Sequence, residues 1–268
     1  MLFPFRDDVP ARRVPIVTYL IIVVNVVTLI WLSRQPLIVQ NVIAYEHGFI
    51  PLRVAQINVP QAIPVRIDVP PRPGFPPQVV QVILSPERAD IYLSFITAMF
   101  LHGGWLHMIG NMWFLWIFGD NVEDRLGHFG FLMLYLVGGI LASLCHWYMQ
   151  PDSSMPVIGA SGAVAAVLGA YVITWPFARV HSLLFLVIFF TVIELPALVV
   201  LGVWFLEQLW AARMVQNKLA AANVAWWAHV GGFIAGMVLM QMLSFGMPDE
   251  PPREEYPFDT AEDQHPAL

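Results

Sequence analysis

Long apolar stretches without a charged residue constrain this chain more than any other feature. The first stretch, residues 14–33, places 20 uncharged residues between Arg13 and Arg34. About 20 apolar residues in a helix cross the hydrocarbon core of a bilayer, whereas a cleaved signal peptide has an apolar core of only about 7–15 residues and a small-residue cleavage site. This stretch therefore predicts a retained transmembrane helix. Comparable uncharged stretches end at Gly119, Pro151, Ala178 and Pro248.

Together these stretches predict an all-α membrane protein with six transmembrane helices. Residues 180–206 are the least regular part, because Glu194 interrupts the apolar sequence and Pro196 follows it. Both residue types suit the first turn of a helix, so we place a helix start near Glu194 and interpret residues 183–192 as an embedded or interfacial loop. The predicted helices span about 14–33, 104–119, 129–149, 158–176, 194–212 and 226–245.

The composition excludes several other classes of protein. The chain is 58% hydrophobic and 12% charged, with a mean hydropathy of +0.66, whereas soluble domains are about 45–50% apolar and about 25% charged. This balance excludes an ordinary soluble enzyme, a disordered chain and a nucleic-acid-binding protein, which would need a basic face. Cys145 is the only cysteine, so an intrachain disulfide and a cysteine-rich metal site are excluded as well.

The segments outside the six predicted helices differ from them in character. Residues 1–13 form an N-terminal tail, and residues 35–90 hold ten of the 22 prolines and predict an extended, water-exposed first loop within the membrane domain of residues 14–245. Residues 89–101 predict an interfacial helix. Residues 246–268 predict an acidic, disordered C-terminal tail.

Charge near the first helix indicates the orientation of the chain. Arg6, Arg12 and Arg13 precede this helix, and no arginine or lysine separates the third helix from the fourth. Basic residues favour the cytoplasmic side. We therefore expect a multi-pass integral protein, placed in a bacterial inner membrane, with a cytoplasmic N-terminus.

Polar side chains gather at the starts of the even-numbered helices. His102, His107 and Asn111 lie at the start of the second helix, Ser161 at the start of the fourth and His229 at the start of the sixth. In an alternating bundle all even helices begin on the same side of the membrane. These five residues are therefore expected to share one leaflet, and polar groups at membrane depth are candidate functional residues.

The residue types in this group favour a serine nucleophile with a histidine base. A serine becomes nucleophilic when a base lies within hydrogen-bonding reach, and His229 can serve Ser161 in this way. Glu194 is predicted on the opposite side, so the chemistry is a dyad without a third acidic member. His107 and Asn111 lie four residues apart on one helical face and could donate to an oxyanion together with the Ser161 backbone N–H.

Structural interpretations of the same residues stay open. Gly159, Gly162 and Ser161 could simply pack helices, as small residues do in membranes, and His229 could be a hydrogen-bonded core histidine. His107 and Asn111 could link helices, and we expect a structural role for His102. No His-x-x-x-His or HExxH spacing accompanies these histidines, so we predict no catalytic metal.

At this point the motifs resemble those of the rhomboid family of intramembrane serine proteases, over about residues 89–243. The matching motifs are His102-x4-His107-x3-Asn111, Gly159-Ala160-Ser161-Gly162 and Ala228-His229-x2-Gly232-x3-Gly236. The segment Gly119–Gly127 also resembles the polar turn after the family's second helix, where Glu123 and Arg125 match a structural network.

This resemblance implies a six-helix bundle with Ser161 as nucleophile and His229 as general base. It implies an oxyanion hole that includes His107, Asn111 and backbone N–H groups, and cleavage of membrane proteins near the ends of their transmembrane segments, in the bilayer and without a cofactor. The linker at residues 213–227 would cap a water-filled cavity, and the fifth helix would act as a lateral gate. Supporting roles fall to His102, Gly159, Gly162, Gly232, Gly236, Glu123 and Arg125.

Two departures from the family pattern qualify these expectations. Ala165 stands four residues after the serine, where many members carry an aromatic ring that stacks on the histidine. Either another ring orients His229 or the dyad is looser. The first loop also lacks the usual Trp-Arg pair.

Two other functions compete with the protease. One is a catalytically silent rhomboid-like protein that binds membrane clients, against which the presence of both Ser161 and His229 argues. The other is an unrelated transporter or channel, which would need charged pathway residues or broken helices in related halves.

Overall fold

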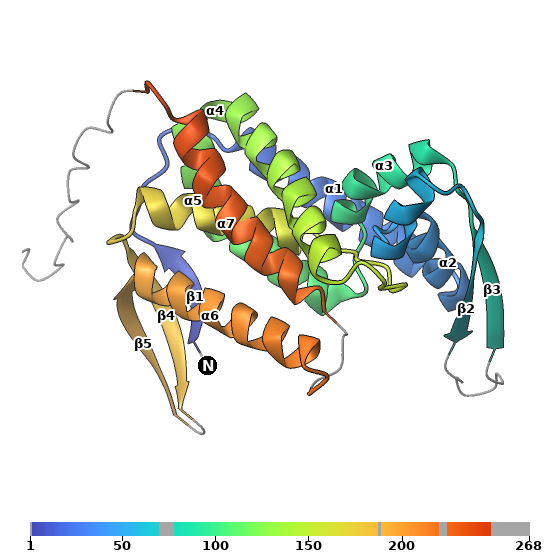
Figure 1. Ribbon diagram of the computed structural model, residues 1–268. Coiled ribbons are helices and arrows are strands. Elements are labelled where there is room, and N and C mark those ends of the chain that lie inside the picture. The colour runs from blue at the N-terminus through green and yellow to red at the C-terminus, as the bar shows by residue number, and fades with distance from the viewer. Residues whose placement is uncertain (1, 70–77, 187–188, 220–223, 248–268) are drawn as a thin grey trace, which may run out of the picture.

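A computed structural model describes residues 2–69, 78–186, 189–219 and 224–247 (Figure 1). Four of its helices are long and apolar enough to cross a membrane, namely α1, α4, α6 and α7. The helices are α1 (Ile16–Ser33), α2 (Leu37–His47), α3 (Arg88–Thr97), α4 (Trp105–Met149), α5 (Ser161–Thr174), α6 (Ala197–Gln216) and α7 (Trp226–Leu243), with 3-10 helices η1 (Pro51–Ile57) and η2 (Ala98–Phe100). The strands are β1 (Leu2–Asp7), β2 (Ile63–Val69), β3 (Gln78–Leu84), β4 (Arg179–Leu186) and β5 (Phe189–Pro196).

Helix α4 contains both the second and the third predicted helices. Its 45 residues run on either side of Gly127, whose φ of 71° and ψ of 166° are not helical. A positive φ is open to glycine at little cost, so the chain bends there. With α1, α5, α6 and α7, the two parts of α4 correspond to the six predicted helices. Six membrane crossings stay a prediction.

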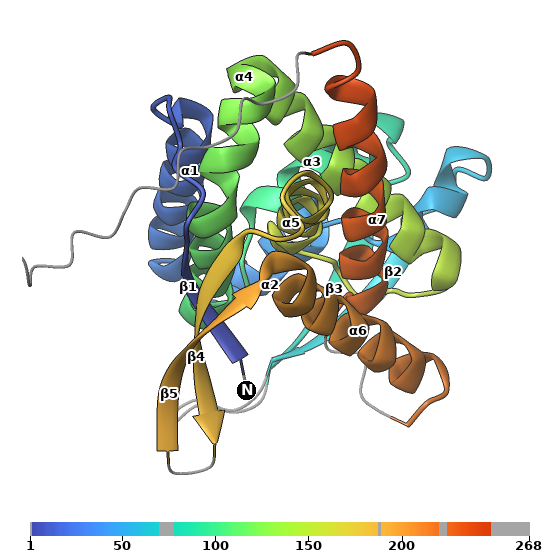
Figure 2. The ribbon, with the colours of Figure 1, turned by 90° about the vertical axis from the view of Figure 1, so that its left-hand side faces the viewer.

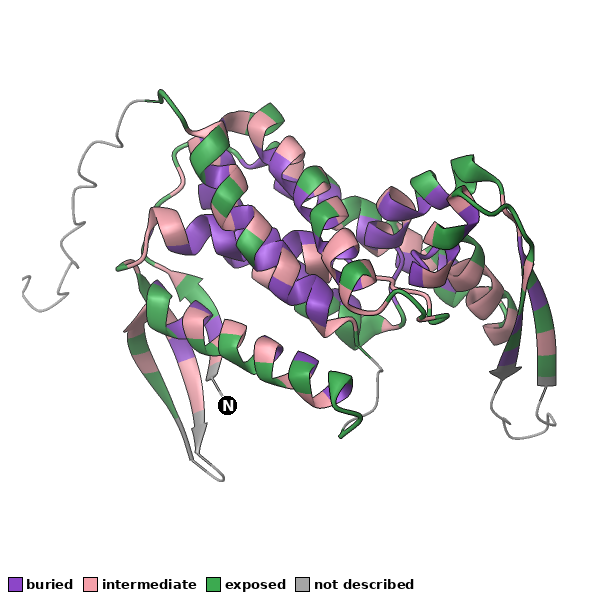
Figure 3. Ribbon diagram, in the orientation of Figure 1, coloured by how far each residue is buried: buried purple, intermediate pink, exposed green. Residues whose placement is uncertain are grey.

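Helix α5 lies at the centre of the bundle, between α4 and α7 (Figure 2). Every residue from Ala163 to Val172 is buried, so the helix is apolar all round (Figure 3). A Cβ on Gly236 of α7 would overlap the carbonyl oxygen of Ala166, and a Cβ on Gly169 would overlap that of Phe233. The two helices therefore approach backbone to backbone, as the small-residue spacing predicts.

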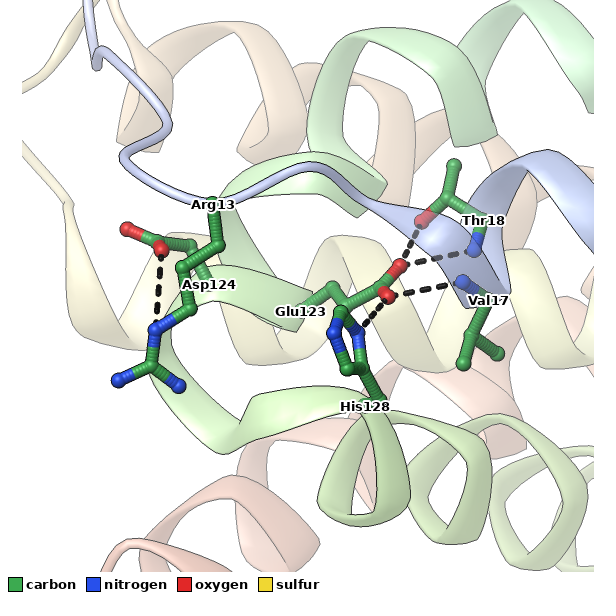
Figure 4. Close-up of polar contacts among 6 residues, drawn as sticks. All are labelled: Arg13, Val17, Thr18, Glu123, Asp124 and His128. Atoms are coloured by element: carbon green, nitrogen blue, oxygen red, sulfur yellow. Dashed lines mark hydrogen bonds and ion pairs between the residues drawn. The ribbon is translucent and has the colours of Figure 1, made fainter.

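Helix α1 is attached to α4 by one buried carboxylate (Figure 4). Glu123 accepts hydrogen bonds from the backbone N–H groups of Val17 and Thr18, each at 2.8 Å, and from Thr18 Oγ1 at 2.7 Å. His128 Nδ1 bonds the same carboxylate. These are unpaired N–H groups of the first turn of α1, so Glu123 caps that helix from its neighbour.

The prediction of an extended loop over residues 35–90 was wrong for most of the segment, whereas its exposure to water outside the membrane stays a prediction. The segment contains α2, η1 and the antiparallel hairpin β2–β3, followed by the first residues of α3. Together α2, η1 and the hairpin enclose a small core of their own, formed by Ile50, Val65, Ile67, Val82 and Leu84. Only the β2–β3 hairpin has the extended backbone that was predicted. Proline is tolerated there, because Pro64 lies in a two-stranded sheet, in which both strands are edge strands. Residues 70–77 lie outside the described part.

Segments predicted as a tail and a loop instead form a three-stranded sheet. The order is β1–β4–β5, with β1 antiparallel to β4 from Leu2↔Leu184 to Asp7↔Val180. The sheet and the β2–β3 hairpin lie at opposite ends of the molecule (Figure 1). Residues 2–7 of the predicted N-terminal tail are thus a strand, and the residues predicted as a loop at 183–192 pair as strands, apart from residues 187–188, which are not described.

The fifth helix begins later than predicted. Glu194 lies on β5, where it faces Arg179 and His181 across the hairpin at 3.6 Å from each, and α6 begins at Ala197 after Pro196. The apolar residues before Glu194 pair with β4 as strand β5, so Glu194 lies in the sheet and not in the first turn of a helix. The acidic tail predicted at residues 246–268 lies almost wholly outside the described residues.

Candidate functional site

Ser161 is the first residue of α5, and the backbone before it is held in place by glycine. Gly159 has a φ of +125°, and a Cβ there would stand 2.7 Å from Cε1 of His107. The Gly159 N–H also donates to the carbonyl oxygen of Ala98 at 2.8 Å. A side chain at position 159 would therefore meet both strain and a collision. This turn presents the half-buried Ser161 at the N-terminus of α5, where backbone N–H groups lack helical partners.

His102 and Asn111 hold the same turn from the side of α4. Ala160 N–H donates to His102 Nε2 at 3.3 Å, and Asn111 Nδ2 lies 3.1 Å from the same nitrogen. Because a backbone N–H can only donate, Nε2 of His102 is the acceptor in this arrangement. His102 is buried. Its ring bonds the Ala160 backbone and the Asn111 amide and so positions both, which agrees with the structural role expected for it.

His107 lies one turn before Asn111 on α4. Its ring is 5.1 Å from that of His102, edge to face, and borders Gly159. Unlike His102, His107 is exposed. The predicted oxyanion residues His107 and Asn111 are therefore brought beside the turn that carries Ser161.

Packing of α7 on α5 brings the first turn of α7 to the first turn of α5. A Cβ on Gly162 would lie 3.8 Å from both Cβ and the carbonyl oxygen of Ala228, and a Cβ on Gly232 would overlap the Gly162 carbonyl oxygen. His229 is therefore on a turn that contacts the turn of Ser161.

Three further residues hold the His229 ring, and none was predicted. Gln208 Oε1 lies 2.8 Å from His229 Nδ1. The rings of Trp204 and Trp226 lie 6.1 Å and 5.8 Å from the imidazole, the second edge to face. The available signal was Gln208 itself, a polar residue inside an apolar helix and four residues after a tryptophan.

These aromatic contacts bear on the unusual Ala165. Ala165 is fully buried and would lie 3.2 Å from a Cβ on Gly232, so it belongs to the α5–α7 contact. Of the two alternatives for this position, the structure favours another ring beside His229, since Trp204 and Trp226 both flank it.

Other predicted residues are placed elsewhere. Glu123 caps α1, and Arg125 lies on the same part of α4, while Glu194 is on β5, in the sheet, rather than at the start of α5 with Ser161. Among the described residues, no group of three His, Cys, Asp or Glu side chains could hold a metal ion. Gly232 and Gly236 make backbone contacts with α5 rather than lining a separate site.

Comparison with known proteins identifies the family. The rhomboid domain matches residues 90–245. Rhomboid-like protein 11, chloroplastic, of Arabidopsis thaliana is 30% identical over 164 residues, which cover 57% of this chain and 53% of that protein. Presenilin-associated rhomboid-like protein A, mitochondrial, of Danio rerio is 31% identical over 156 residues, 57% of this chain and 38% of that protein.

A third relative shows the same partial overlap. Rhomboid protein 1, mitochondrial, of Saccharomyces cerevisiae is 30% identical over 164 residues, 59% of this chain and 43% of that protein. The chain thus spans about half of the first relative and about two fifths of the other two. The matched domain covers more than half of this chain and contains the turns of Ser161 and His229. This multi-pass membrane protein belongs to the rhomboid family.

Proposed function

We propose that the protein is an intramembrane serine endopeptidase that hydrolyses peptide bonds in or near transmembrane segments of membrane proteins. The observation that supports the proposal is the close contact between the first turns of α5 and α7, where Gly162, next to Ser161, lies against Ala228, next to His229. His107 and Asn111 border the same turn. Four residues from three distant parts of the sequence thus gather around one helix N-terminus.

The proposed reaction begins with attack by Ser161 on the carbonyl carbon of the substrate peptide. A bond forms from Oγ to that carbon, the hydroxyl proton passes to His229 Nε2, and the carbonyl electrons move onto oxygen. His107, Asn111 and the Ser161 backbone N–H donate to this oxyanion. The C–N bond then breaks, and His229 returns the proton to the leaving amine.

Water completes the cycle in this proposal. His229 removes a proton from a water molecule, the hydroxide adds to the acyl carbon, and the ester bond to Oγ breaks as the proton returns to Ser161. His107, beside this turn, is exposed at the surface of the described structure, and in this proposal water enters there. Resident metal or organic groups take no part in these steps.

The length of α5 supports a site below the membrane surface. Its 14 residues span about 21 Å, which is shorter than the roughly 30 Å hydrocarbon core. Irregular backbone at membrane depth is tolerated where protein covers it or water reaches it. The turn at Gly159–Ser161 meets this condition, because the Ala160 N–H donates to His102 Nε2 and the Gly159 N–H donates to the carbonyl oxygen of Ala98.

The alternative function is a catalytically silent rhomboid-like protein that binds membrane clients. The names of the relatives do not decide between the two, since two are called rhomboid-like proteins. The presence of Ser161 and His229 on contacting turns favours the protease, because client binding alone requires neither side chain. A silent protein would retain the bundle and fail the chemical test that follows.

A serine-directed covalent probe tests the proposal. We expect a fluorophosphonate to label the purified protein, and Ser161→Ala and His229→Ala each to abolish labelling. Ser154→Ala is the matched control, because Ser154 is an exposed serine in the loop that leads to the site, and it should label like the wild type. Labelling that survives Ser161→Ala would contradict the assignment.

The orientation belongs to the same proposal. Arg6, Arg12 and Arg13 precede α1 and favour a cytoplasmic N-terminus, in a bacterial inner membrane. We expect a single cysteine at position 8, in the variant Asp8→Cys with Cys145→Ala, to resist an impermeant maleimide in intact cells and to react after lysis. Reaction in intact cells would reverse the orientation.

A further inference from the structure

Gln208 is a buried amide in the middle of α6, directed at His229. Gln208 is 7% exposed, and its Oε1 lies 2.8 Å from His229 Nδ1. The residue lies outside the motifs on which the proposed dyad rests. A buried polar side chain in a helix of this kind costs free energy unless it is fully paired. The partners of its amide Nε2 and Oε1 therefore indicate what the side chain does in this place.

The orientation of the Gln208 amide is set by its own helix. Its Nε2 donates to the carbonyl oxygen of Trp204, one turn earlier, at 3.2 Å. Turning the amide over would set Oε1 against that carbonyl oxygen, and two acceptors repel. The oxygen of the amide thus faces His229.

This orientation selects one tautomer of His229. A carbonyl oxygen only accepts, so the proton of the neutral imidazole must be on Nδ1. The lone pair is then on Nε2, which is the nitrogen that a serine base needs. In the triad of soluble serine proteases a carboxylate holds the histidine in the corresponding tautomer.

The rings beside His229 restrict the same imidazole. Trp204 lies on α6 one turn before Gln208, and its ring is inclined by 30° to that of His229. Trp226 contacts the imidazole edge to face from α7. A residue that selects the tautomer and rings that limit rotation together define one position for Nε2.

We propose that Gln208 is a positioning residue for His229, an amide that takes the place of the carboxylate absent from this dyad. The inference rests on the proposed function, because it assigns the base of that reaction its tautomer. Trp204 contributes through its backbone carbonyl, which fixes the Gln208 amide. Two consecutive hydrogen bonds, from Gln208 Nε2 to the Trp204 carbonyl oxygen and between His229 Nδ1 and Gln208 Oε1, thus link α6 to α7 at the site.

Kinetic constants of three variants test the role in catalysis. Gln208→Leu removes the acceptor at nearly constant size, and we expect kcat to fall roughly 10- to 100-fold with KM nearly unchanged. Gln208→Glu keeps an oxygen acceptor for His229 but sets its second oxygen against the Trp204 carbonyl, so it should recover only part of the kcat that Gln208→Leu loses. Gln216→Leu, at an exposed residue of the same helix, is the matched control and should behave like the wild type.

The tautomer itself is measured without any turnover. In protein labelled with 15N-histidine and carrying Ser161→Ala, the nitrogen shifts of His229 should report a protonated Nδ1 and a bare Nε2. We expect Gln208→Leu in this background to give a mixture of tautomers. An unchanged His229 spectrum together with an unchanged kcat in Gln208→Leu would overturn the inference.

The two measurements separate this inference from the proposed function. If Ser161→Ala keeps full probe labelling, the dyad is wrong, whereas the nitrogen shifts still report whether Gln208 selects the tautomer. If Ser161→Ala abolishes labelling while Gln208→Leu keeps wild-type kcat and tautomer, the protease stands and the positioning role falls.

Discussion

At the scale of single residues, Gly159 combines two constraints that no other residue type could meet. Its φ of +125° and the His107 ring 2.7 Å from its missing Cβ both require glycine. The turn that carries Ser161 therefore depends on the absence of one methyl group. Conformational strain of this kind costs about 1–3 kcal/mol per residue.

Gly159→Ala should damage the site more than the fold. We expect the variant to lose most of its probe labelling, since the new methyl displaces His107 or shifts the Ser161 turn, with a loss of stability of about 1–3 kcal/mol. Gly103→Ala is the control, because a Cβ there has only Ile158 Cδ1 nearby, at 3.9 Å. Labelling rates and Tm of both variants give the comparison, and unimpaired labelling of Gly159→Ala would refute the constraint.

A functional residue could be predicted from the sequence when it stands in a short motif, and not when its role depends on the packing of two distant helices. Gly159, Ser161 and His229 stand in short motifs, and their places at helix starts follow from the hydrophobic pattern. Gln208 has no such motif. Its role arises only when α6 packs on α7, so the one signal was a polar residue in an apolar helix.

At the scale of elements, helices were predictable and strands were not. Apolar stretches with few charges mark α1, α4, α6 and α7 because membrane crossing imposes length and composition together. The sheet joins β1 to β4, about 180 residues apart along the chain. Pairing between segments so far apart leaves no pattern in the local sequence of either one, so the sequence does not indicate that β1 and β4 pair.

Strand β1 is also the element with a pH-dependent attachment. Asp7 at its end accepts hydrogen bonds from Tyr171 of α5, at 2.5 Å, and from Asn121 of α4, at 3.0 Å. Burial is the main cause that raises the pKa of Asp7 from 3.8 to about 7, the Tyr171 bond opposes the rise, and the nearby carboxylates of Asp120 and Asp8 add to it. The sheet therefore rests on a carboxyl group that titrates near neutral pH.

The sign of this effect gives a testable pH dependence. The folded pKa lies above the unfolded value, so the stabilisation is fully present below about pH 4 and is lost as the pH rises toward 7. We expect amide exchange in β1, corrected for the intrinsic rate, to accelerate between about pH 4 and 7. Asp7→Asn should abolish this dependence, whereas Asp8→Asn should retain it. The same acceleration in Asp7→Asn would assign the titration to another group.

At the scale of the whole molecule, different structural units lie at its two ends. The unit formed by α2, η1 and the β2–β3 hairpin lies at the end where α5 begins, and Phe49 bridges to Val157 in the loop before Ser161. The sheet β1–β4–β5 and the Glu123 cap of α1 lie away from that end. The described structure thus braces the loop of the candidate site from outside the helix bundle.

Helix α6 has a special place in this arrangement. Its outward face exposes Leu206 and Trp210, while Trp204 and Gln208 contact His229 on α7. The helix that the family resemblance implies as a lateral gate therefore also holds the proposed base. Movement of α6 away from α7 would separate Gln208 and Trp204 from the imidazole of His229.

The most direct test of the central claim is cleavage of a single-span reporter protein after both proteins are reconstituted into lipid vesicles. The account predicts that wild-type protein cuts the reporter in or near its transmembrane segment, that Ser161→Ala and His229→Ala leave it whole, and that Ser154→Ala cuts it normally. Cleavage by Ser161→Ala at the wild-type rate would contradict the account.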